Sequence, residues 1–272
     1  MKRIVAMLAS LILVLTIPLG NIVYALDAVE SEIIEPDYID VIEEVFPGIK
    51  DGQISPQWTS GAPDAANPKT HGYITKIALN LLRGDNASAK SFYSGYLPTL
   101  VRGSVLPDSD ETTGVYAWHF YGENGKNYSG GPITAYSKCV EHYYNAVSQY
   151  RNGSRALAME TLGRALHYLQ DVNVPHHAKN ATAVFTNHTH FESMAENNME
   201  SYAVSKLTSD EYSDANKYVG TLVDEYANIA RGWYAKASSG NTEQMLNAAR
   251  SCIRNSQRAT ATLLYKFMLE VS

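Results

Sequence analysis

Residues 154–175 read SRALAMETLGRALHYLQDVNVP, and this stretch sets the expected fold class. Ser154 is a residue type that commonly caps a helix, and Pro175 cannot continue a helix interior. The leucines between them recur at helical spacing: Leu157, Leu162, Leu166 and Leu169. The pattern predicts one amphipathic helix over 154–171, with these leucines on its buried face and Pro175 ending it.

Similar patterns continue on both sides of this helix. Apolar residues from Ile74 to Leu82 predict a helix from about residue 70 that Gly84 stops. The segment 85–132 is rich in Gly, Pro, Asp and Asn, which predicts loops with short helices. Further helices are expected over 133–151, 188–206, 209–238 and 241–270, the last one capped by Thr242. Because convincing strand alternation is lacking, we expect an all-α protein with a single domain over 58–272.

The N-terminal part of the chain has a different character. A positively charged start precedes an apolar run and a small-residue cleavage site at 23–25, so residues 1–25 are expected to be the signal peptide of a secreted protein. An uncleaved membrane anchor is the alternative, although the apolar run is short for a span. Residues 26–57 are acidic, which favours a pro-segment over an N-terminal arm that stays attached.

Composition and charge exclude several classes of protein. Of 272 residues, 45% are hydrophobic and 18% are charged, as in ordinary globular proteins rather than disordered or collagen-like chains. Residues 1–57 hold nine of the 28 acids and three of the 22 bases, which leaves 19 of each in 58–272. A neutral body has no gross attraction for nucleic acid, so no nucleic-acid partner is expected. Because no second long apolar run follows, we expect no integral membrane protein.

Cys139 and Cys252 are the two cysteines of the chain. Export would allow them to form a disulfide. Both also lie in helix-like stretches, where each could serve as a small buried apolar residue. Their spacing does not indicate a metal site.

The densest group of metal-ligating residue types lies over 167–192. His167 and Asp171 are four residues apart, as are His188 and Glu192, so each pair shares one face of a helix. His177 lies between the pairs. Imidazole nitrogen and carboxylate oxygen are zinc ligands, and pairs on neighbouring helices can enclose a metal. One such pair alone would be an ordinary surface pair, but an unpaired charge in a helix of apolar spacing would be costly.

Four ordered motifs resemble the bacterial zinc-dependent phospholipase C family, which includes bacillus enzymes and the catalytic domain of clostridial alpha-toxins. They are W-x₁₂-H from Trp58, P-D and then H-F-Y at Asp108 and His119, H-Y-L-x-D-V-N-x-P-x-H from His167, and H-x-x-F-E from His188. The resemblance covers the chain from Trp58 to about residue 197.

The resemblance implies an all-helical domain that binds three zinc ions at the base of a cleft. The implied ligands are Asp108, His119, His167 and Asp171 for one ion, His177, His188 and Glu192 for a second, and Trp58 and His71, with Asp171 bridging, for a third. Trp58 would bind through its α-amino nitrogen, which is free only once residues 26–57 are removed. Asp108 would also act as the general base. Three histidines fall outside the pattern: His142, His176 and His190.

Together the residues and the resemblance imply a monomeric zinc enzyme that hydrolyses phospholipid at a membrane surface to diacylglycerol and a phosphorylated head group. Tyr116 would keep one aromatic face of the head-group pocket. Gly61 and Ser109 replace two other pocket residues of the bacillus enzymes, so preference for phosphatidylcholine does not follow. The alternatives are a zinc-dependent single-strand nuclease of the same fold and a secreted metal-binding protein without catalysis.

Overall fold

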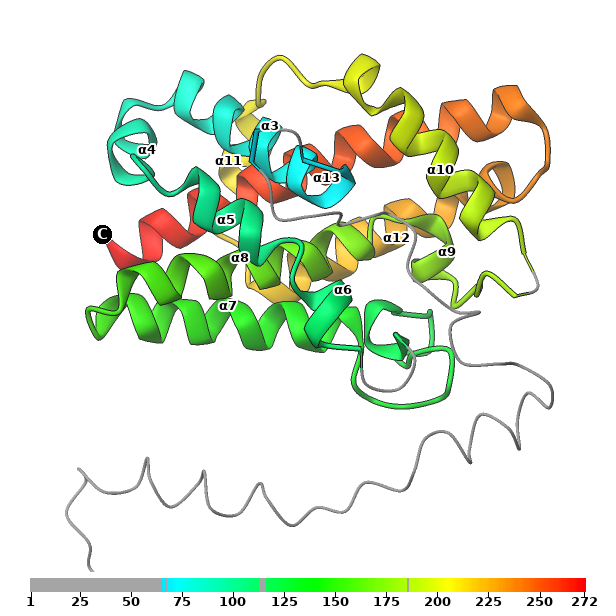
Figure 1. Ribbon diagram of the computed structural model, residues 1–272, viewed down its shortest axis with the longest axis horizontal. Coiled ribbons are helices and arrows are strands. Elements are labelled where there is room, and N and C mark those ends of the chain that lie inside the picture. Colours follow the sequence, from blue (N-terminus) through cyan, green and yellow to red (C-terminus); the bar gives the residue numbers. More distant parts are fainter. Residues whose placement is uncertain (1–64, 67, 113–115, 185) are drawn as a thin grey trace, which may run out of the picture. The chain divides into compact units, whose positions relative to one another are not determined.

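The computed structural model describes residues 65–66, 68–112, 116–184 and 186–272, and the structural statements below concern these residues. The signal peptide, the pro-segment and Trp58 lie outside them. All of the described residues fall in one compact unit that is helical and contains no strand, which confirms the expected all-α class (Figure 1).

The longer helices are α3 (Thr70–Asp85), α7 (Ala135–Arg151), α8 (Arg155–Asp171), α10 (His188–Asn198), α12 (Val219–Ala237) and α13 (Thr242–Val271). The short ones are α4 (Ala87–Phe92), α5 (Leu97–Gly103), α6 (Pro107–Asp110), η2 (Ala117–His119), α9 (Pro175–Ala178), η3 (Met199–Tyr202) and α11 (Ser209–Asp214). The short helices between α3 and α7 agree with the segment that was expected to hold loops and short helices.

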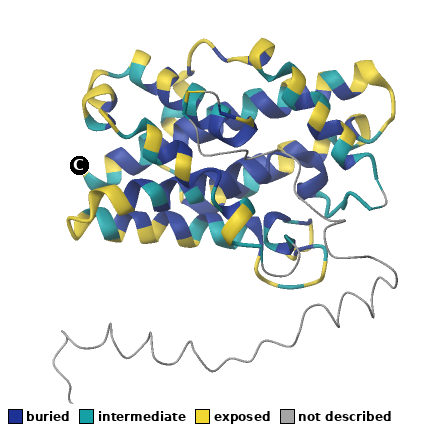
Figure 2. Cartoon of the chain, in the orientation of Figure 1, coloured by how far each residue is buried: buried dark blue, intermediate teal, exposed yellow. Residues whose placement is uncertain are grey.

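Helices α7 and α8 form an antiparallel pair whose members run side by side (Figure 1). The buried faces of this pair join α12 and α13 in the larger of two apolar clusters, and Figure 2 shows this buried interior. A smaller cluster gathers around Ile74, Phe191 and Ile253 from α3, α10 and α13. Just after α8 the chain passes from one apolar cluster to the other, because Val172 belongs to the larger cluster and Val174 to the smaller one.

Two glycines allow α5 and α8 to touch through their main chains. A Cβ atom added to Gly103 would lie 2.1 Å from the carbonyl oxygen of Glu160, and one added to Gly163 would lie 2.6 Å from that of Leu100. Neither position therefore accommodates a side chain. This contact brings the segment that follows α5, including α6, close to the C-terminal part of α8.

The structure corrects two details of the helix expected over 154–171. Leu157 is 53% exposed, because five residues of helix turn it about 140° away from Leu162. Ser154 occupies the N-cap position, but its side chain makes no capping hydrogen bond. The helix ends at Asp171, as expected, and Pro175 follows four residues later and opens α9, where its missing N–H group costs nothing.

Other boundaries also differ from the expectation. The helix expected over 188–206 ends at Asn198 and continues only as η3. The one expected over 209–238 is two helices, because the chain turns at 215–218 between α11 and α12. Asn241, not Thr242, caps α13, since its side-chain oxygen accepts a hydrogen bond from the backbone N–H of Gln244 at 3.0 Å.

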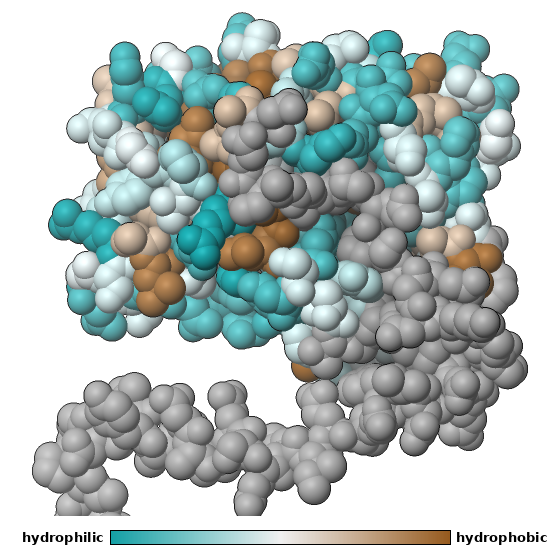
Figure 3. Space-filling view, viewed as in Figure 1, coloured by the Kyte–Doolittle hydropathy of each residue, from teal (hydrophilic) through white to brown (hydrophobic). Residues whose placement is uncertain are grey.

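Cys139 in α7 and Cys252 in α13 are free thiols, and both are buried. They therefore serve as small apolar residues, and burial raises the pKa of each thiol. Among the described helices, none has both the length and the apolar composition needed to cross a membrane. In Figure 3, the coloured part of the visible face carries small hydrophobic patches among hydrophilic residues.

Candidate metal centre

Eight of the nine predicted ligands lie among the described residues, and the fold gathers them near the C-terminal end of α8. They come from α3 (His71), α6 (Asp108), η2 (His119), α8 (His167 and Asp171), α9 (His177) and α10 (His188 and Glu192). Asp108 has 12% of its side chain exposed, whereas each of the other seven side chains is at most 2% exposed.

Asp108, His119 and His167 form one group of potential ligand atoms that all lie within 4.8 Å of one another. Oδ1 of Asp108 is 3.6 Å from Nδ1 of His119 and 3.4 Å from Nε2 of His167. The two imidazole nitrogens are 3.0 Å apart. Two ring nitrogens and a carboxylate oxygen therefore converge on one point, as zinc ligands do.

Asp171 joins this group to His71. Its Oδ2 atom is 2.9 Å from Nδ1 of His119 and 3.1 Å from Nε2 of His167, whereas its Oδ1 atom is 3.6 Å from Nε2 of His71. His71, His167 and Asp171 form a second candidate group. One carboxylate thus faces two groups with different oxygens, an arrangement suited to bridging two metal ions.

His177, His188 and Glu192 form the third candidate group. Oε1 of Glu192 is 3.4 Å from Nε2 of His177 and 3.0 Å from Nε2 of His188. His188 and Glu192 are one helical turn apart in α10, and both point toward α9. Nδ1 of His177 is 3.4 Å from Oδ1 of Asp171, so this group adjoins the other two.

Hydrogen bonds outside the groups fix the orientation of three imidazole rings. His71 bonds through Nδ1 to Oε1 of Gln170 at 2.8 Å, and His177 bonds through Nδ1 to the carbonyl oxygen of His119 at 2.9 Å. His167 bonds through Nδ1 to the carbonyl oxygen of Ser104 at 3.0 Å. A ring that donates from Nδ1 turns the lone pair of Nε2 toward the cluster, which is the tautomer a metal requires.

The buried polar atoms of the cluster test whether a metal fits here. Nε2 of His177 and Nε2 of His188 make no hydrogen bond with any described residue, although both lie close to Glu192. Buried polar groups are normally hydrogen-bonded, and those that are not need another partner. Nitrogen and oxygen atoms that approach closely without hydrogen-bond alignment are consistent with ligands that point at a shared ion.

The ionisation of the cluster in the protein chain alone also suits a cation. Burial lowers the pKa of His167, but the carboxylates of Asp171 and Asp108 outweigh this and raise it to about 9. Burial lowers the pKa of His71 to about 4, and the charge of His167 adds to this effect. Although burial opposes it, His167 and His119 hold the pKa of Asp171 well below its ordinary value. Asp171 is therefore ionised at neutral pH, and metal binding would displace the proton of His167.

Comparison with known proteins identifies the family. The sequence profile of the zinc dependent phospholipase C family matches residues 70–239, which include all eight described ligands. The chain belongs to this zinc-dependent phospholipase C family. Phospholipase C of Paraclostridium bifermentans is 32% identical over 235 residues, covering 75% of this chain and 59% of the relative. A phospholipase C of Bacillus cereus is 25% identical over 212 residues, covering 70% of this chain and 71% of the relative.

A solved structure of a clostridial toxin has the same fold. The alpha-toxin of Clostridium absonum aligns with a TM-score of 0.70 and 25% sequence identity, over 76% of this chain and 66% of the toxin. The chain thus spans about 59% of the length of its Paraclostridium relative and 66% of that of the toxin.

The three histidines outside the predicted pattern are also outside the candidate groups, and Tyr116 lies beside the ligand His119. His176 stacks on His188 with ring centroids 4.8 Å apart, and His142 contacts Glu111, so neither enters a candidate group. His190 is exposed. The Tyr116 ring lies 5.7 Å from that of His119, and Tyr116 has a left-handed backbone with φ of 64°.

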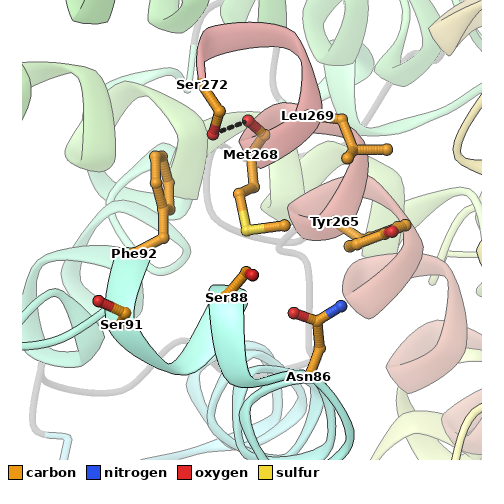
Figure 4. Close-up of a pocket in the computed structure, with 8 residues that line it drawn as sticks. All are labelled: Asn86, Ser88, Ser91, Phe92, Tyr265, Met268, Leu269 and Ser272. Atoms are coloured by element: carbon orange, nitrogen blue, oxygen red, sulfur yellow. Dashed lines mark hydrogen bonds between the residues drawn. The ribbon is translucent and has the colours of Figure 1, made fainter.

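A groove of about 560 Å³ between α4 and the C-terminal end of α13 lies elsewhere. Figure 4 shows its eight lining residues, from Asn86 to Ser272, and none of the candidate ligands is among them. It is therefore separate from the metal centre.

Sequence patterns missed the residues that hold the ligands in place. Gln170 and Ser104 orient two histidines, but neither residue type signals this role without the fold. The Gln170 position offered one clue, because it lies between two ligands in a buried helical turn. Glu111 and the side chains that contact it belong to no sequence motif.

Proposed function

We propose that this protein is a zinc-dependent phospholipase C that hydrolyses the phosphodiester bond of phospholipids. The observation that carries the proposal is the convergence of eight buried or nearly buried ligands into three adjoining groups, with Asp171 between them. The family membership of the chain supplies the substrate class. The products would be diacylglycerol and a phosphorylated head group.

The three groups would hold three zinc ions. Asp108, His119, His167 and Asp171 would bind one, His177, His188 and Glu192 a second, and His71, Asp171 and the α-amino group of Trp58 a third. When bound, zinc lowers the pKa of a water molecule and neutralises charge on phosphoryl oxygens.

Asp108 is the proposed general base. It is the most exposed of the eight described ligands, so its carboxylate lies at the edge of the cluster where a water molecule and substrate can arrive. A carboxylate in that position can accept a proton from the water whose oxygen bonds to phosphorus. The bond between phosphorus and the glycerol oxygen breaks in the same reaction, and the glycerol oxygen takes up a proton to give diacylglycerol. Tyr116, beside His119, would contact the head group with its ring.

A lipid and DNA assay tests the proposed function. Chain 58–272 with zinc is expected to release phosphorylated head groups from one or more of phosphatidylcholine, phosphatidylethanolamine and sphingomyelin. Asp171→Asn should abolish this turnover, whereas Asp224→Asn, a partly exposed acid that bonds Tyr121, should retain it. Cleavage of single-stranded DNA instead would favour the nuclease, and turnover of neither class would favour a non-catalytic metal-binding protein.

Processing offers a second test, because an amide nitrogen is a poor ligand. A secreted precursor, 26–272, would lack the Trp58 amine and should be much less active than chain 58–272 at equal zinc concentration. Cleavage after Gln57 should restore activity. A precursor as active as the trimmed chain would exclude a role for the amine.

A further inference from the structure

Glu111 lies at the C-terminal end of α6, and its carboxylate receives four donors from two other helices. Its Oε2 atom is 3.0 Å from the hydroxyl of Tyr168, 3.0 Å from Nε2 of His142 and 3.1 Å from Nζ of Lys138. Nη1 of Arg164 donates to Oε1 at 2.7 Å. The Glu111 side chain is only 13% exposed, so these contacts are shielded from water.

The anchored segment is too short to hold its own position. Helix α6 comprises four residues, Pro107–Asp110, and an isolated single turn is unstable because its nucleation is costly. Arg164 also donates a hydrogen bond from Nη2 to Oδ2 of Asp110 in the same turn, at 2.6 Å. Asp108, the ligand at the edge of the cluster, lies within this turn. Its placement therefore depends on the contacts that tie α6 to α7 and α8.

The donors of Glu111 also contact the neighbours of other ligands. The Tyr168 ring lies 5.2 Å from the His119 ring, and Tyr168 follows His167 in α8. Nζ of Lys138 lies 5.1 Å from the ring of Trp118, which precedes His119 in η2. One carboxylate thus connects the three segments that carry Asp108, His119 and His167.

The third candidate group lies on other helices than Glu111 and its four donors. His177, His188 and Glu192 lie on α9 and α10, whereas Glu111 and its described partners lie on α6, α7 and α8 or at their ends. The network is therefore placed to affect the group of Asp108, His119 and His167 and to leave the group of His177, His188 and Glu192 unchanged.

From these contacts, we infer that Glu111 is a positioning residue that holds Asp108 and His119 at the metal group they form with His167. The inference rests on the proposed function only for its effect on turnover, because the effect on metal binding is independent of substrate.

The test replaces Glu111 with Gln and measures zinc affinity by competition with a chelator, before any assay of turnover. Loss of a ligand's supporting contact typically weakens metal binding by about 10- to 100-fold. We expect a loss of this size for at least one zinc equivalent, while the equivalent held by His177, His188 and Glu192, which share no ligand with the disturbed group, is unchanged. Turnover should fall through kcat rather than KM, and Glu111→Asp should recover part of both effects.

Glu211→Gln provides a matched control. Glu211 is 12% exposed and pairs with Arg258 at 2.9 Å, so its environment is similar, but it contacts none of the candidate ligands among the described residues. This control should bind zinc like the unmodified protein. If Glu111→Gln retains full zinc affinity and kcat, or if Glu211→Gln loses as much affinity, the inference is wrong.

Tyr168→Phe keeps the test decisive if Glu111→Gln fails to fold. It removes one hydroxyl from the network and keeps the ring beside His119. A smaller loss of zinc affinity for the same equivalent is expected, and unchanged affinity would overturn the inference. The unmodified protein could bind zinc and the variants could weaken that binding, while no form hydrolyses phospholipid. That result would refute the proposed function and leave the positioning role intact.

Discussion

The two ends of α8 bury opposite kinds of side chain to the same extent. Met159, Leu162 and Leu166 are fully buried in the apolar cluster, and His167 and Asp171, in the last five residues of the helix, are fully buried as well. Burial of the first set is favourable by itself, because apolar surface leaves water. Burial of the second set is unfavourable unless the charges have partners. One end of the helix therefore stabilises the fold, and the other depends on what it binds.

Removal of metal should produce the largest difference in behaviour between the polar and the apolar end of α8. A chelator is expected to abolish turnover and to lower stability, by about 4 kcal/mol for each site that was filled at 1,000 times its Kd. The apolar cluster should keep the helices formed, so far-UV circular dichroism at 25 °C should change little. Loss of helical signal together with activity would show that the two ends fold as one unit.

Asp108→Asn changes a ligand from α6 that lies against the polar end of α8 and leaves the apolar cluster untouched. Removing the charge and the base from a side chain of the same shape should lower turnover by about 10² or more, the usual range for loss of a general base. Steady-state kinetics at saturating zinc, with metal content measured on the same sample, checks this. Near-normal turnover with zinc bound would refute the assignment of Asp108.

Leu166→Ala affects the apolar end. Deleting a fully buried leucine side chain should cost about 2–5 kcal/mol of stability, measured by urea unfolding. Leu157→Ala is the matched control on the same helix, and as an exposed position it should change stability by no more than about 0.5 kcal/mol. Zinc stoichiometry should be normal in both variants. A changed stoichiometry in Leu166→Ala would show that metal binding at the polar end depends on packing at the apolar end.

Acid should weaken the contacts by which Glu111 joins the end of α6 to α7 and α8. Burial raises the pKa of this carboxyl, but His142, Lys138 and Arg164 outweigh burial and hold it below its ordinary value. A depressed folded-state pKa means that the stabilisation is complete above the unfolded pKa of about 4.3 and is lost as the pH falls through the folded value.

The stability advantage of the unmodified protein over Glu111→Gln, about 1.5–3 kcal/mol at pH 7, should therefore shrink below about pH 4. Urea unfolding of both proteins from pH 7 to pH 3 measures it. A difference that stays constant over this range would show that the charge of Glu111 does not stabilise the fold.

The sequence revealed what regular spacing encodes. The amphipathic spacing from Leu162 to Leu169 predicted α8, and the spacing of four between His167 and Asp171 placed both on one face of that helix. Its limits are equally physical. Leu157 was assigned to the buried face because it is apolar, although its angle on the helix directs it to solvent.

Contacts between distant segments could not be predicted in the same way. Glu111 and Arg164 are 53 residues apart, and a lone Glu in a turn has many possible partners. Gln170 holds His71 across 99 residues of sequence, which only the packing of α3 against α8 brings about. Family resemblance supplied the ligand set, but the residues that orient the ligands follow from tertiary structure.

The contact between Gly103 and Gly163 makes the main chain a fixed spacer for the metal centre. Because no side chain separates α5 from α8, the approach of the two helices is set by hard contact between backbone atoms. Repacking of apolar side chains elsewhere can change stability without changing this spacing. A single methyl group at either glycine would instead push the segment bearing Asp108 away from His167. These two glycines thus set how far apart the main chains lie beside the ligands Asp108 and His167.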